Sequence, residues 1–398
     1  MIDKSYVLFT RIAIVKTDSG RMYCDPLWAK DLRLHLDYIS DFRICCPVVN
    51  SNEIRGLEDI SEYRIKRYIE LRKDYGLMSI VRNLIPNFIQ VIRACKGASI
   101  VHSEGAGWAF PLSFYLLFLK PFFRFQWIVL IESSPWMCHK NEKLTPRKFV
   151  THYFYKLVLS LCMKQADARI FTQSFYRKFF LKEETARTLI APATWIDNVN
   201  LVSPDAVKKR YLERKGRTLR LIFPARLVEE KGVFVLFDAI KHLENQSMGV
   251  EITIMGSGVL AADCREFATR KFGDVIVSYC SPIEYGSQFF EFLRSYDAVL
   301  VPNLKDEQPR IVFDAFSQGL GVIASDTSGI LDIAVDGENA VICPRGDSLG
   351  LANAISRVVK EPDLVLKMGL NGLNYANGKT HYQMHLDRQS FFARVLDI

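Results

Sequence analysis

Short apolar runs rich in β-branched residues alternate with longer segments of helical period along the first half of the chain. Each run ends in polar residues, which is typical of a parallel sheet whose strands are joined by crossover helices. The pattern predicts a Rossmann-like domain over residues 1–205. Its expected strands are Tyr6 to Val15, Arg43 to Val49, Ser99 to His102, Trp127 to Ile131, Ala168 to Thr172 and the short run Thr188 to Ala191.

The alternation starts again after residues 206–218, which are charged, carry no strand pattern and are expected to link two domains. A second doubly wound domain is predicted over residues 219–375, because buried strands and amphipathic segments again follow one another. Residues 376–398 form an amphipathic tail. The expected strands of the second domain are Leu219 to Phe223, Glu251 to Met255, Val275 to Tyr279, Ala298 to Pro302, Gly321 to Ser325 and Ala340 to Cys343.

The composition fits a globular protein of two domains. The chain of 398 residues can bury two cores, and its 49% hydrophobic and 24% charged residues are ordinary values. Residues 1–5 lack the features of a signal peptide, so we expect a cytoplasmic protein. The most apolar stretch, Trp108 to Leu119, is shorter than the roughly 20 residues of a membrane span, and no span is predicted.

Cysteine usage and charge narrow the chemistry. Nine cysteines occur without CxxC or Cys/His spacing, so neither a disulfide framework nor a zinc site is indicated. The net charge of +8 indicates an anionic partner, such as a nucleotide diphosphate, a phospholipid surface or a nucleic acid. Nucleic-acid binding is disfavoured because the charge forms no known motif. A nicotinamide-dependent oxidoreductase is disfavoured because no complete GxGxxG follows any expected strand.

A first candidate site joins an expected strand to an expected helix over Phe223 to Gly232. Arg226 and Lys231 lie there near a helix N-terminus, where cations are unfavourable unless an anion lies between them. This favours an anion site beyond the carboxyl end of the strand. The alternative is a solvated loop in which the two cations pair with Glu229 and Glu230.

Two further glycines, Gly256 and Gly258, directly follow the expected strand that ends at Met255. Ala261 occupies the third glycine position, so the GxGxxG pattern is incomplete. Gly256 is therefore a candidate residue of a phosphate- or nucleotide-binding loop, with a simple tight turn as the alternative.

The segment from Pro302 to Gly319 carries the densest set of candidate side chains. A strand ends at Pro302, a polar loop follows, and a helix closes at Gly319. Asp306 precedes this helix and Asp314 lies within it. Carboxylates so placed can accept hydrogen bonds from sugar hydroxyls while the helix amides meet a phosphate. The alternatives are helix-terminal charge for Asp306 and a surface position for Asp314.

Residues 219 to about 370 resemble the donor domain of the retaining glycosyltransferases of family 4, which have the GT-B fold. That family has G/A-R at a strand end, K-G five residues later, and an E-x7-E element. Here Ala225-Arg226, Lys231-Gly232 and Asp306-x7-Asp314 stand in those places. The resemblance implies two doubly wound α/β domains of Rossmann type that face a central cleft. It also implies that the tail 376–398 packs back on the N-terminal domain.

The resemblance implies roles for the residues of these motifs. Arg226 and Lys231 would bind the donor diphosphate, Asp306 would hold hydroxyls of the transferred sugar, and Asp314 would hold the ribose. No metal or other cofactor is expected. The backbone that would line the leaving group is that of Glu307, Gln308, Pro309, Arg310 and Ile311.

The N-terminal half resembles the family more loosely, as expected of an acceptor-binding domain. Gly20 is assigned to the first strand-to-helix loop, and His102 and Glu104 to the end of a strand. Glu132 stands where the family often has a histidine that faces the donor sugar. The alternatives are a loop cap for Glu132 and a core or rim position for His102.

Cations and apolar residues are interleaved in one part of this half. Lys148, His152 and Lys156 are spaced four apart on an expected helix, and the segment Phe118 to Trp127 includes Lys120 and Arg124 among aromatic residues. Such interleaving suits a surface that binds anionic lipid. The alternative is a buried helix with a solvated basic stripe.

We therefore expect a cytoplasmic enzyme, positioned at the inner face of a membrane, that moves a hexose-type sugar from a nucleoside diphosphate sugar to a hydroxyl with retention of configuration. The resemblance implies a glycan or lipid-linked acceptor and a place in polysaccharide, lipopolysaccharide or glycolipid synthesis. Arg226, Lys231 and a helix N-terminus can stabilise the departing diphosphate without a metal. Because both acids of the E-x7-E element are aspartates here, the alternative is a catalytically silent relative that binds nucleotide sugars or docks on membranes.

Overall fold

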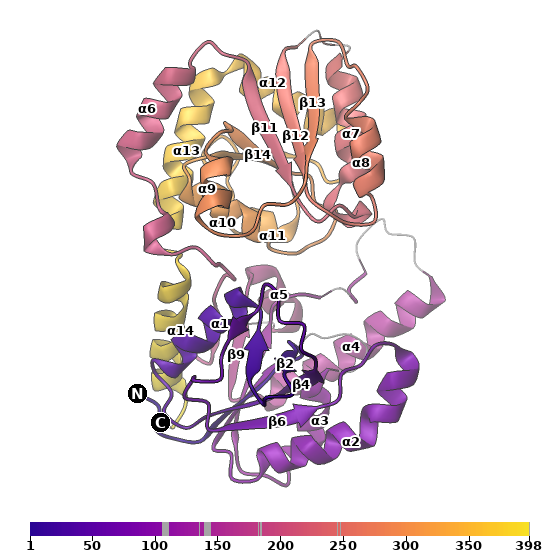
Figure 1. Cartoon of the computed structure of the whole chain (residues 1–398), viewed down its shortest axis with the longest axis vertical. Helices are drawn as coiled ribbons and strands as arrows, with labels where there is room; N and C mark the ends of the chain where they lie inside the picture. Colours follow the sequence, from indigo (N-terminus) through magenta and orange to yellow (C-terminus); the bar gives the residue numbers. More distant parts are fainter. Residues whose placement is uncertain are drawn as a thin grey trace. The chain divides into compact units, whose positions relative to one another are not determined.

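The computed structural model describes residues 1–105, 111–134, 136–138, 145–181, 183, 185–244, 246 and 248–397 (Figure 1). The chain forms two compact units. One comprises Met1–Pro192 together with Met384–Ile398, and the other comprises Ala193–Gln383. Within the described residues, no helix combines the length and the apolar character that a membrane span requires. All nine cysteines are free, and most of them are buried.

The first unit is built on a mainly parallel sheet with the order β10-β9-β8-β7-β1-β4, to which β6 adds beside β4. The order of these strands along the chain is that of a doubly wound sheet, in which β1 lies between β4 and β7. The strands are β1 (Tyr6–Phe9), β4 (Phe42–Asn50), β6 (Arg67–Leu71), β7 (Ile100–Glu104), β8 (Gln126–Ile131), β9 (Ala168–Phe171) and β10 (Thr188–Ile190).

A small extension continues this sheet beyond β4. It contains β2 (Ile14–Lys16), β3 (Met22–Cys24) and β5 (Glu58–Asp59), and β3 runs antiparallel to both of its neighbours. The predicted single strand from Tyr6 to Val15 is therefore wrong, because the chain leaves the central sheet after Phe9 and pairs again only at Ile14.

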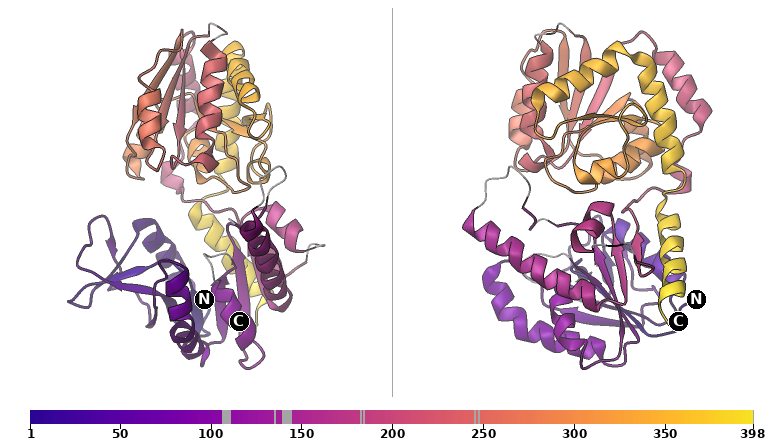
Figure 2. Two further views of the ribbon diagram at one scale, coloured as in Figure 1. Left: turned by 90° about the vertical axis from the view of Figure 1, so that its right-hand side faces the viewer. Right: turned by 180° about the vertical axis from the view of Figure 1, so that it is seen from behind.

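Helices cover both faces of the first sheet (Figure 2). Alternate side chains of β1 point to opposite faces, so that Val7 and Phe9 join one apolar core and Tyr6 and Leu8 the other. The first core contains residues of α2 (Leu77–Cys95), α3 (Leu112–Leu119), α4 (Pro146–Gln165) and α5 (Ser174–Phe180). The second contains residues of α1 (Pro26–Leu36) and of α14 (His381–Val395), including Phe391 and Phe392. The C-terminal tail thus packs on the first sheet through these two rings.

The second unit has a six-stranded, fully parallel sheet with the order β13-β12-β11-β14-β15-β16. This is a doubly wound Rossmann-like sheet, and the fold class predicted from the sequence is confirmed in both units. The strands are β11 (Leu219–Pro224), β12 (Val250–Met255), β13 (Val275–Cys280), β14 (Ala298–Val301), β15 (Gly321–Ser325) and β16 (Ala340–Cys343). The helices are α7 (Val233–Glu244), α8 (Ala261–Phe267), α9 (Ser287–Leu293), α10 (Arg310–Ser317), α11 (Ser328–Leu331), α12 (Ser348–Lys360) and α13 (Pro362–Ala376).

The expected linker at 206–218 is instead largely helical and belongs to the second unit. Ser203 caps α6 (Pro204–Arg214), and Arg210 donates hydrogen bonds to the carbonyls of Gln318 and Gly319 at 2.8 Å each. An apolar helical period is absent here because Val207 is the only described residue of α6 that is buried.

Candidate functional site

The second unit has a topological switch point between β11 and β14. The helix that follows β11 is α7 and packs in one core, whereas the helix that follows β14 is α10 and packs in the core on the other face. In such sheets ligands bind beyond the carboxyl ends of the two diverging strands. The candidate residues Arg226 and Lys231 follow β11, and Asp306 and Glu307 follow β14. The fold therefore gathers both sequence motifs at one edge of the sheet.

The segments after β11 and β14 are in direct contact. The amide of Leu304 donates to the carbonyl of Glu230 at 2.9 Å. Gly232 follows the short 3-10 turn η2 (Glu229–Lys231) and has a φ of +82°, and a β-carbon there would lie 2.0 Å from the carbonyl oxygen of Pro302. Only glycine fits both the backbone conformation and the space. The K-G motif thus brings Lys231 to the end of β14.

Lys231 and Glu307 form an ion pair at this point. The two side chains are 17% and 32% exposed, and the amide of Asn303 donates to the same Glu307 oxygen at 3.1 Å. Asn303 is itself buried, and its carbonyl accepts a hydrogen bond from Ser325 at 2.5 Å. The partly buried ammonium of Lys231 is therefore held beside Glu307, whose carboxylate accepts from both Lys231 and Asn303.

Arg226 forms an ion pair with Glu230 at 2.8 Å. This is the contact expected if the segment is a solvated loop. Its side chain is 66% exposed. An exposed ion pair contributes little to stability, so the guanidinium can leave Glu230 for a stronger anion at small cost.

Asp306 forms hydrogen bonds with Ser328 and Arg345. One carboxylate oxygen accepts from the amide and hydroxyl of Ser328, at 2.8 and 2.6 Å, and the other accepts from Arg345 at 3.0 Å. Its side chain is 8% exposed. Asp306 thus ties the loop after β14 to the start of α11. The acid beside Lys231 is Glu307, for which the family resemblance implies only a backbone contact.

Asp314 is buried within α10 rather than at the surface. Its carboxylate accepts a hydrogen bond from the Tyr285 hydroxyl at 2.9 Å. Burial, followed by the negative charge of Asp314, raises the pKa of Tyr285 well above its usual value. The surface alternative for Asp314 is therefore wrong, and its contact with a ribose stays a prediction.

The segment that precedes α10 contains an unsatisfied polar side chain. Both amide atoms of Gln308 are buried and have no hydrogen-bond partner among the described residues. Pro309 is buried and stands at the helix start, whereas Arg310 lies over the ring of Trp195 at 5.0 Å. Ile311 packs partly buried against the core. A buried amide without a partner is costly, which favours a ligand as the missing partner of Gln308.

Gly256 packs against protein backbone. A β-carbon at this glycine would lie 1.9 Å from the carbonyl oxygen of Ala225. The amide of Leu227 also donates to the carbonyl of Ser257 at 2.7 Å. These contacts account for Gly256 by close packing of two loops, as the tight-turn alternative had suggested.

In the first unit, Glu104 lies at the corresponding switch point between β1 and β7. Its carboxylate accepts hydrogen bonds from the Thr10 hydroxyl and, at 3.3 Å, from the Arg11 amide. Burial raises the pKa of Glu104 to about 7, and the charge of Glu132 adds to the rise while the Thr10 hydrogen bond opposes it. Glu132 follows β8 and is exposed. These two acids therefore lie close enough to interact electrostatically.

Two other candidates of the first unit lie elsewhere. Gly20 is exposed at the turn of the β2–β3 hairpin, where its amide donates to Thr17, so its assignment to a strand-to-helix loop is wrong. The error follows from merging β1 and β2 into one strand. His102 lies within β7, is 2% exposed and is 2.7 Å from the Tyr6 hydroxyl. His102 is therefore a core residue, which was the alternative to a functional role.

Among the described residues, one cluster has the spacing of metal ligands. Asp31 and His35 of α1 and His385 of α14 each place a ligand atom within 4.8 Å of the others. Burial lowers the pKa of His385 to about 3, and the positive charge of Arg388 contributes to the shift. This nearby cation also opposes a bound metal ion. The ring of His385 donates to the Asp31 carboxylate at 2.9 Å, which joins the two helices without a metal.

The expected basic apolar face is only partly at the surface. Trp127 and Phe125 are buried in the core, and Lys120 forms an ion pair with Asp167 at 2.6 Å. The ring of His152 accepts from the Cys138 amide at 3.1 Å. The exposed apolar side chains of this region lie at the end of α3, just after it and on α4, namely Phe118, Phe122, Phe149, Val150, Tyr153, Phe154, Leu157 and Leu161.

These features define an α/β protein of two units in which Arg226 and Lys231 lie at the switch point of the second unit. Residues 218–361 match the family model described as Glycosyl transferases group 1. A glycosyltransferase of Methanocaldococcus jannaschii is 24% identical over 82% of this chain and 87% of its own length. The capsular polysaccharide biosynthesis glycosyltransferase CapM of Staphylococcus aureus is 22% identical over 41% of this chain and 42% of its own.

Among solved structures, Anabaena HepE in complex with UDP and glucose superposes with a TM-score of 0.65. The match has 13% identity and covers 99% of this chain and 100% of the other. The match to the glycosyl transferases group 1 family thus lies in the second unit, and the chain has the GT-B fold. It is a glycosyltransferase. The arrangement of its two domains about a cleft stays a prediction.

Proposed function

We propose that the protein transfers a sugar from a nucleoside diphosphate sugar to a hydroxyl acceptor with retention of configuration. The observation that carries this proposal is the ion pair of Lys231 and Glu307 at the switch point between β11 and β14. A partly buried ammonium there suits a diphosphate, which accumulates negative charge as it leaves. The solved complex of the similar HepE with UDP and glucose supports this donor class.

In the proposed reaction, the bond between the anomeric carbon and the diphosphate oxygen breaks, and a bond to the acceptor oxygen forms on the same face of the sugar. The acceptor proton passes to the departing phosphate oxygen. Lys231, Arg226 and the first amides of α10 stabilise the leaving group, so the proposal includes neither a metal nor an organic cofactor. When Lys231 binds the diphosphate and leaves its ion pair with Glu307, the Glu307 carboxylate can accept hydrogen bonds from sugar hydroxyls.

We further propose that the acceptor is a glycan or a lipid-linked glycan in polysaccharide synthesis. The name of the similar CapM, a capsular polysaccharide biosynthesis glycosyltransferase, supports this class. Glu104, at the switch point of the first unit, and the exposed Glu132 are the proposed acceptor-side contacts.

Donor binding and turnover test this proposal. We expect one member of a panel of UDP-, GDP- and ADP-sugars to raise the melting temperature, because a ligand at 100 times its Kd stabilises the fold by about 2.7 kcal/mol. That sugar should also be hydrolysed slowly without an acceptor. Binding without hydrolysis or transfer would favour the catalytically silent alternative, and no binding by any nucleotide sugar would refute the proposal.

A separate observation favours peripheral contact with an anionic membrane at its inner face. The sequences of α2, α3, α4 and α5, which together cover one face of the first sheet, contain no Asp or Glu. We call these four helices the acid-free layer. The cations Arg147 and Lys156 lie among exposed side chains of α4, including Val150 and Leu157, which are 66% and 62% exposed. Apolar and cationic side chains together suit an interfacial surface.

Liposome binding tests this contact. Replacing Arg124, Lys148 and Lys156 by Gln should weaken binding to anionic vesicles and leave donor affinity unchanged. Lys120 is kept because its ion pair with Asp167 is structural. Equal vesicle binding by the variant and the wild type would mean that these cations form an ordinary solvated stripe without a role in membrane binding.

A further inference from the structure

Helix α2 of the acid-free layer has an apolar stripe that the core does not use. Met78, Val81, Ile85 and Ile89 are 82%, 66%, 70% and 46% exposed. Their spacing of three and four residues places them on one side of the helix. Val91, on the opposite side, is fully buried. The helix therefore packs through one face and leaves an apolar stripe on the other.

Cations accompany this stripe, and the sequence of α2 contains no Asp or Glu. Arg82 and Arg93 are exposed on α2 at helical spacing from Ile85 and Ile89. Exposed contiguous apolar side chains on a soluble domain indicate an interaction surface, and flanking cations specify an anionic partner.

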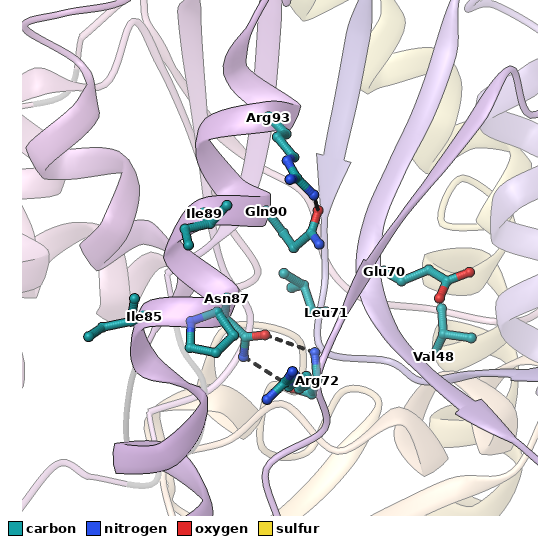
Figure 3. Close-up of a pocket in the computed structure, with 10 residues that line it drawn as sticks. Val48, Glu70, Leu71, Arg72, Ile85, Asn87, Ile89, Gln90 and Arg93 are labelled. Atoms are coloured by element: carbon teal, nitrogen blue, oxygen red, sulfur yellow. Dashed lines mark hydrogen bonds between the residues drawn. The ribbon is translucent and has the colours of Figure 1, made fainter.

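A cavity of about 510 Å³ lies beside the stripe, between α2 and the end of β6 (Figure 3). Ile85 and Ile89 of the stripe form part of its wall, and Arg72 and Arg93 also line it. Glu70, the acid that lines this cavity, pairs with Lys16 at 3.0 Å. The cavity thus combines two guanidinium groups with an apolar wall.

The backbone that carries Arg72 is fixed against α2. Asn87 is 5% exposed, accepts from the Arg72 amide at 2.8 Å and donates to the Arg72 carbonyl at 3.1 Å (Figure 3). Within the described part of the chain, the Arg72 side chain forms no ion pair. A guanidinium on a fixed backbone and without an acidic partner is ready to bind an anion.

We propose that this cavity binds the phosphodiester head group of an anionic phospholipid, with the lipid chains against Ile85 and Ile89. Arg72 and Arg93 bind the phosphate oxygens, and the stripe on α2 enters the outer layer of the bilayer leaflet. The inference rests on the proposed membrane contact and gives it a specific lipid site. It is independent of the donor site, which belongs to the other unit.

The test compares two variants of the full chain with the same change of charge. Arg72→Gln with Arg93→Gln removes the cavity cations, whereas Arg55→Gln with Arg64→Gln removes two exposed cations that do not line the cavity. Binding is measured by co-sedimentation with phosphatidylcholine vesicles that contain phosphatidylglycerol. We expect the first variant to bind at least tenfold more weakly and the second to change less than twofold. Equal losses in both variants would overturn the site.

Two further arms identify the ligand. Soluble glycerophosphoglycerol should bind the wild type and not the Arg72→Gln, Arg93→Gln variant, and inorganic phosphate at the same concentration should bind more weakly. If inorganic phosphate binds as tightly, the cavity takes free phosphate and the lipid assignment is wrong. Ile85→Ser with Ile89→Ser should weaken vesicle binding and leave glycerophosphoglycerol binding unchanged. Unchanged vesicle binding would also refute the lipid contact.

Thermal unfolding and donor binding without vesicles complete the design. All variants alter exposed side chains, so their melting temperatures should match the wild type. A protein that binds its nucleotide sugar but no anionic vesicle would refute the lipid site and leave the glycosyltransferase proposal standing. The reverse result would refute the proposed donor site alone.

Discussion

Lys231 and Glu307 lie 76 residues apart in the sequence and form an ion pair where β11 and β14 end side by side. Asn303 donates to the same carboxylate, so Glu307 keeps one partner if Lys231 binds another anion. This exchange of partners is what a site for a leaving diphosphate requires, because the cation must be positioned before the donor arrives.

Lys231→Ala should lower turnover at least tenfold with the true donor. The contact of an ammonium with a phosphate contributes roughly 1.5–3 kcal/mol, and about 1.4 kcal/mol corresponds to one decade in rate. Stability should change little, because Asn303 still donates to Glu307. Lys241→Ala, on the exposed surface of α7, is the matched control. Near-normal transfer by a folded Lys231→Ala protein would show that this loop is not the diphosphate site.

Glu307→Gln and Asp306→Asn should separate activity from stability. Glu307 is partly exposed beside Lys231. Glu307→Gln should therefore reduce the rate of transfer with little effect on the free energy of unfolding. Asp306 accepts hydrogen bonds from Ser328 and Arg345, so Asp306→Asn should destabilise the fold by about 1.5–3 kcal/mol. Urea denaturation and initial rates measure the two effects. The opposite pattern would assign the sugar contact to Asp306, as the family motif implies.

The sequence predicted the sheets well because strands in parallel sheets are continuous apolar runs. The expected strands 219–223 and 321–325 correspond closely to β11 and β15. It failed where local pattern is weak. The β2–β3 hairpin is held by pairing with β4, a contact that is distant in sequence, and α6 has only one buried side chain among those described.

At the site, motif register predicted which segments meet but not which partners each side chain has. Asp306 stands in the register of the family acid, yet Arg345 and Ser328 draw its carboxylate to α11. Those partners come from later strands and helices, so no spacing rule reveals them. The acidic doublet Asp306-Glu307 was the available signal, because one of two adjacent acids can point to the site while the other caps a helix.

Asp314→Ala should destabilise the second unit by about 1–3 kcal/mol, because it leaves the buried Tyr285 hydroxyl without its acceptor. Tyr285→Phe removes the same hydrogen bond but keeps the carboxylate. If Asp314 also binds the ribose, its alanine variant should weaken nucleotide binding and Tyr285→Phe should not. Calorimetric titration with the free nucleotide and denaturant unfolding measure the two effects. Equal nucleotide affinity in both variants would limit Asp314 to a structural role.

Glu104 should make stability depend on pH in a range where ordinary carboxylates do not titrate. Burial raises its folded-state pKa to about 7 from an ordinary value of 4.5. The folded protein therefore keeps Glu104 protonated above pH 4.5, where the unfolded chain already ionises it. This group's contribution is fully present below pH 4.5, is lost as pH rises toward 7, and is constant above that.

Glu104→Gln removes this titration while it keeps a neutral side chain that can accept from Thr10. Relative to the wild type, the variant should gain about 2–3 kcal/mol of unfolding free energy between pH 4.5 and pH 8, since one pKa unit corresponds to 1.36 kcal/mol. Denaturant unfolding of both proteins at pH 4.5, 6 and 8 measures the difference. Glu132→Gln should shift the wild-type transition to lower pH, because the charge of Glu132 contributes to the raised pKa. Parallel pH profiles for wild type and Glu104→Gln would mean that Glu104 ionises normally in the folded protein.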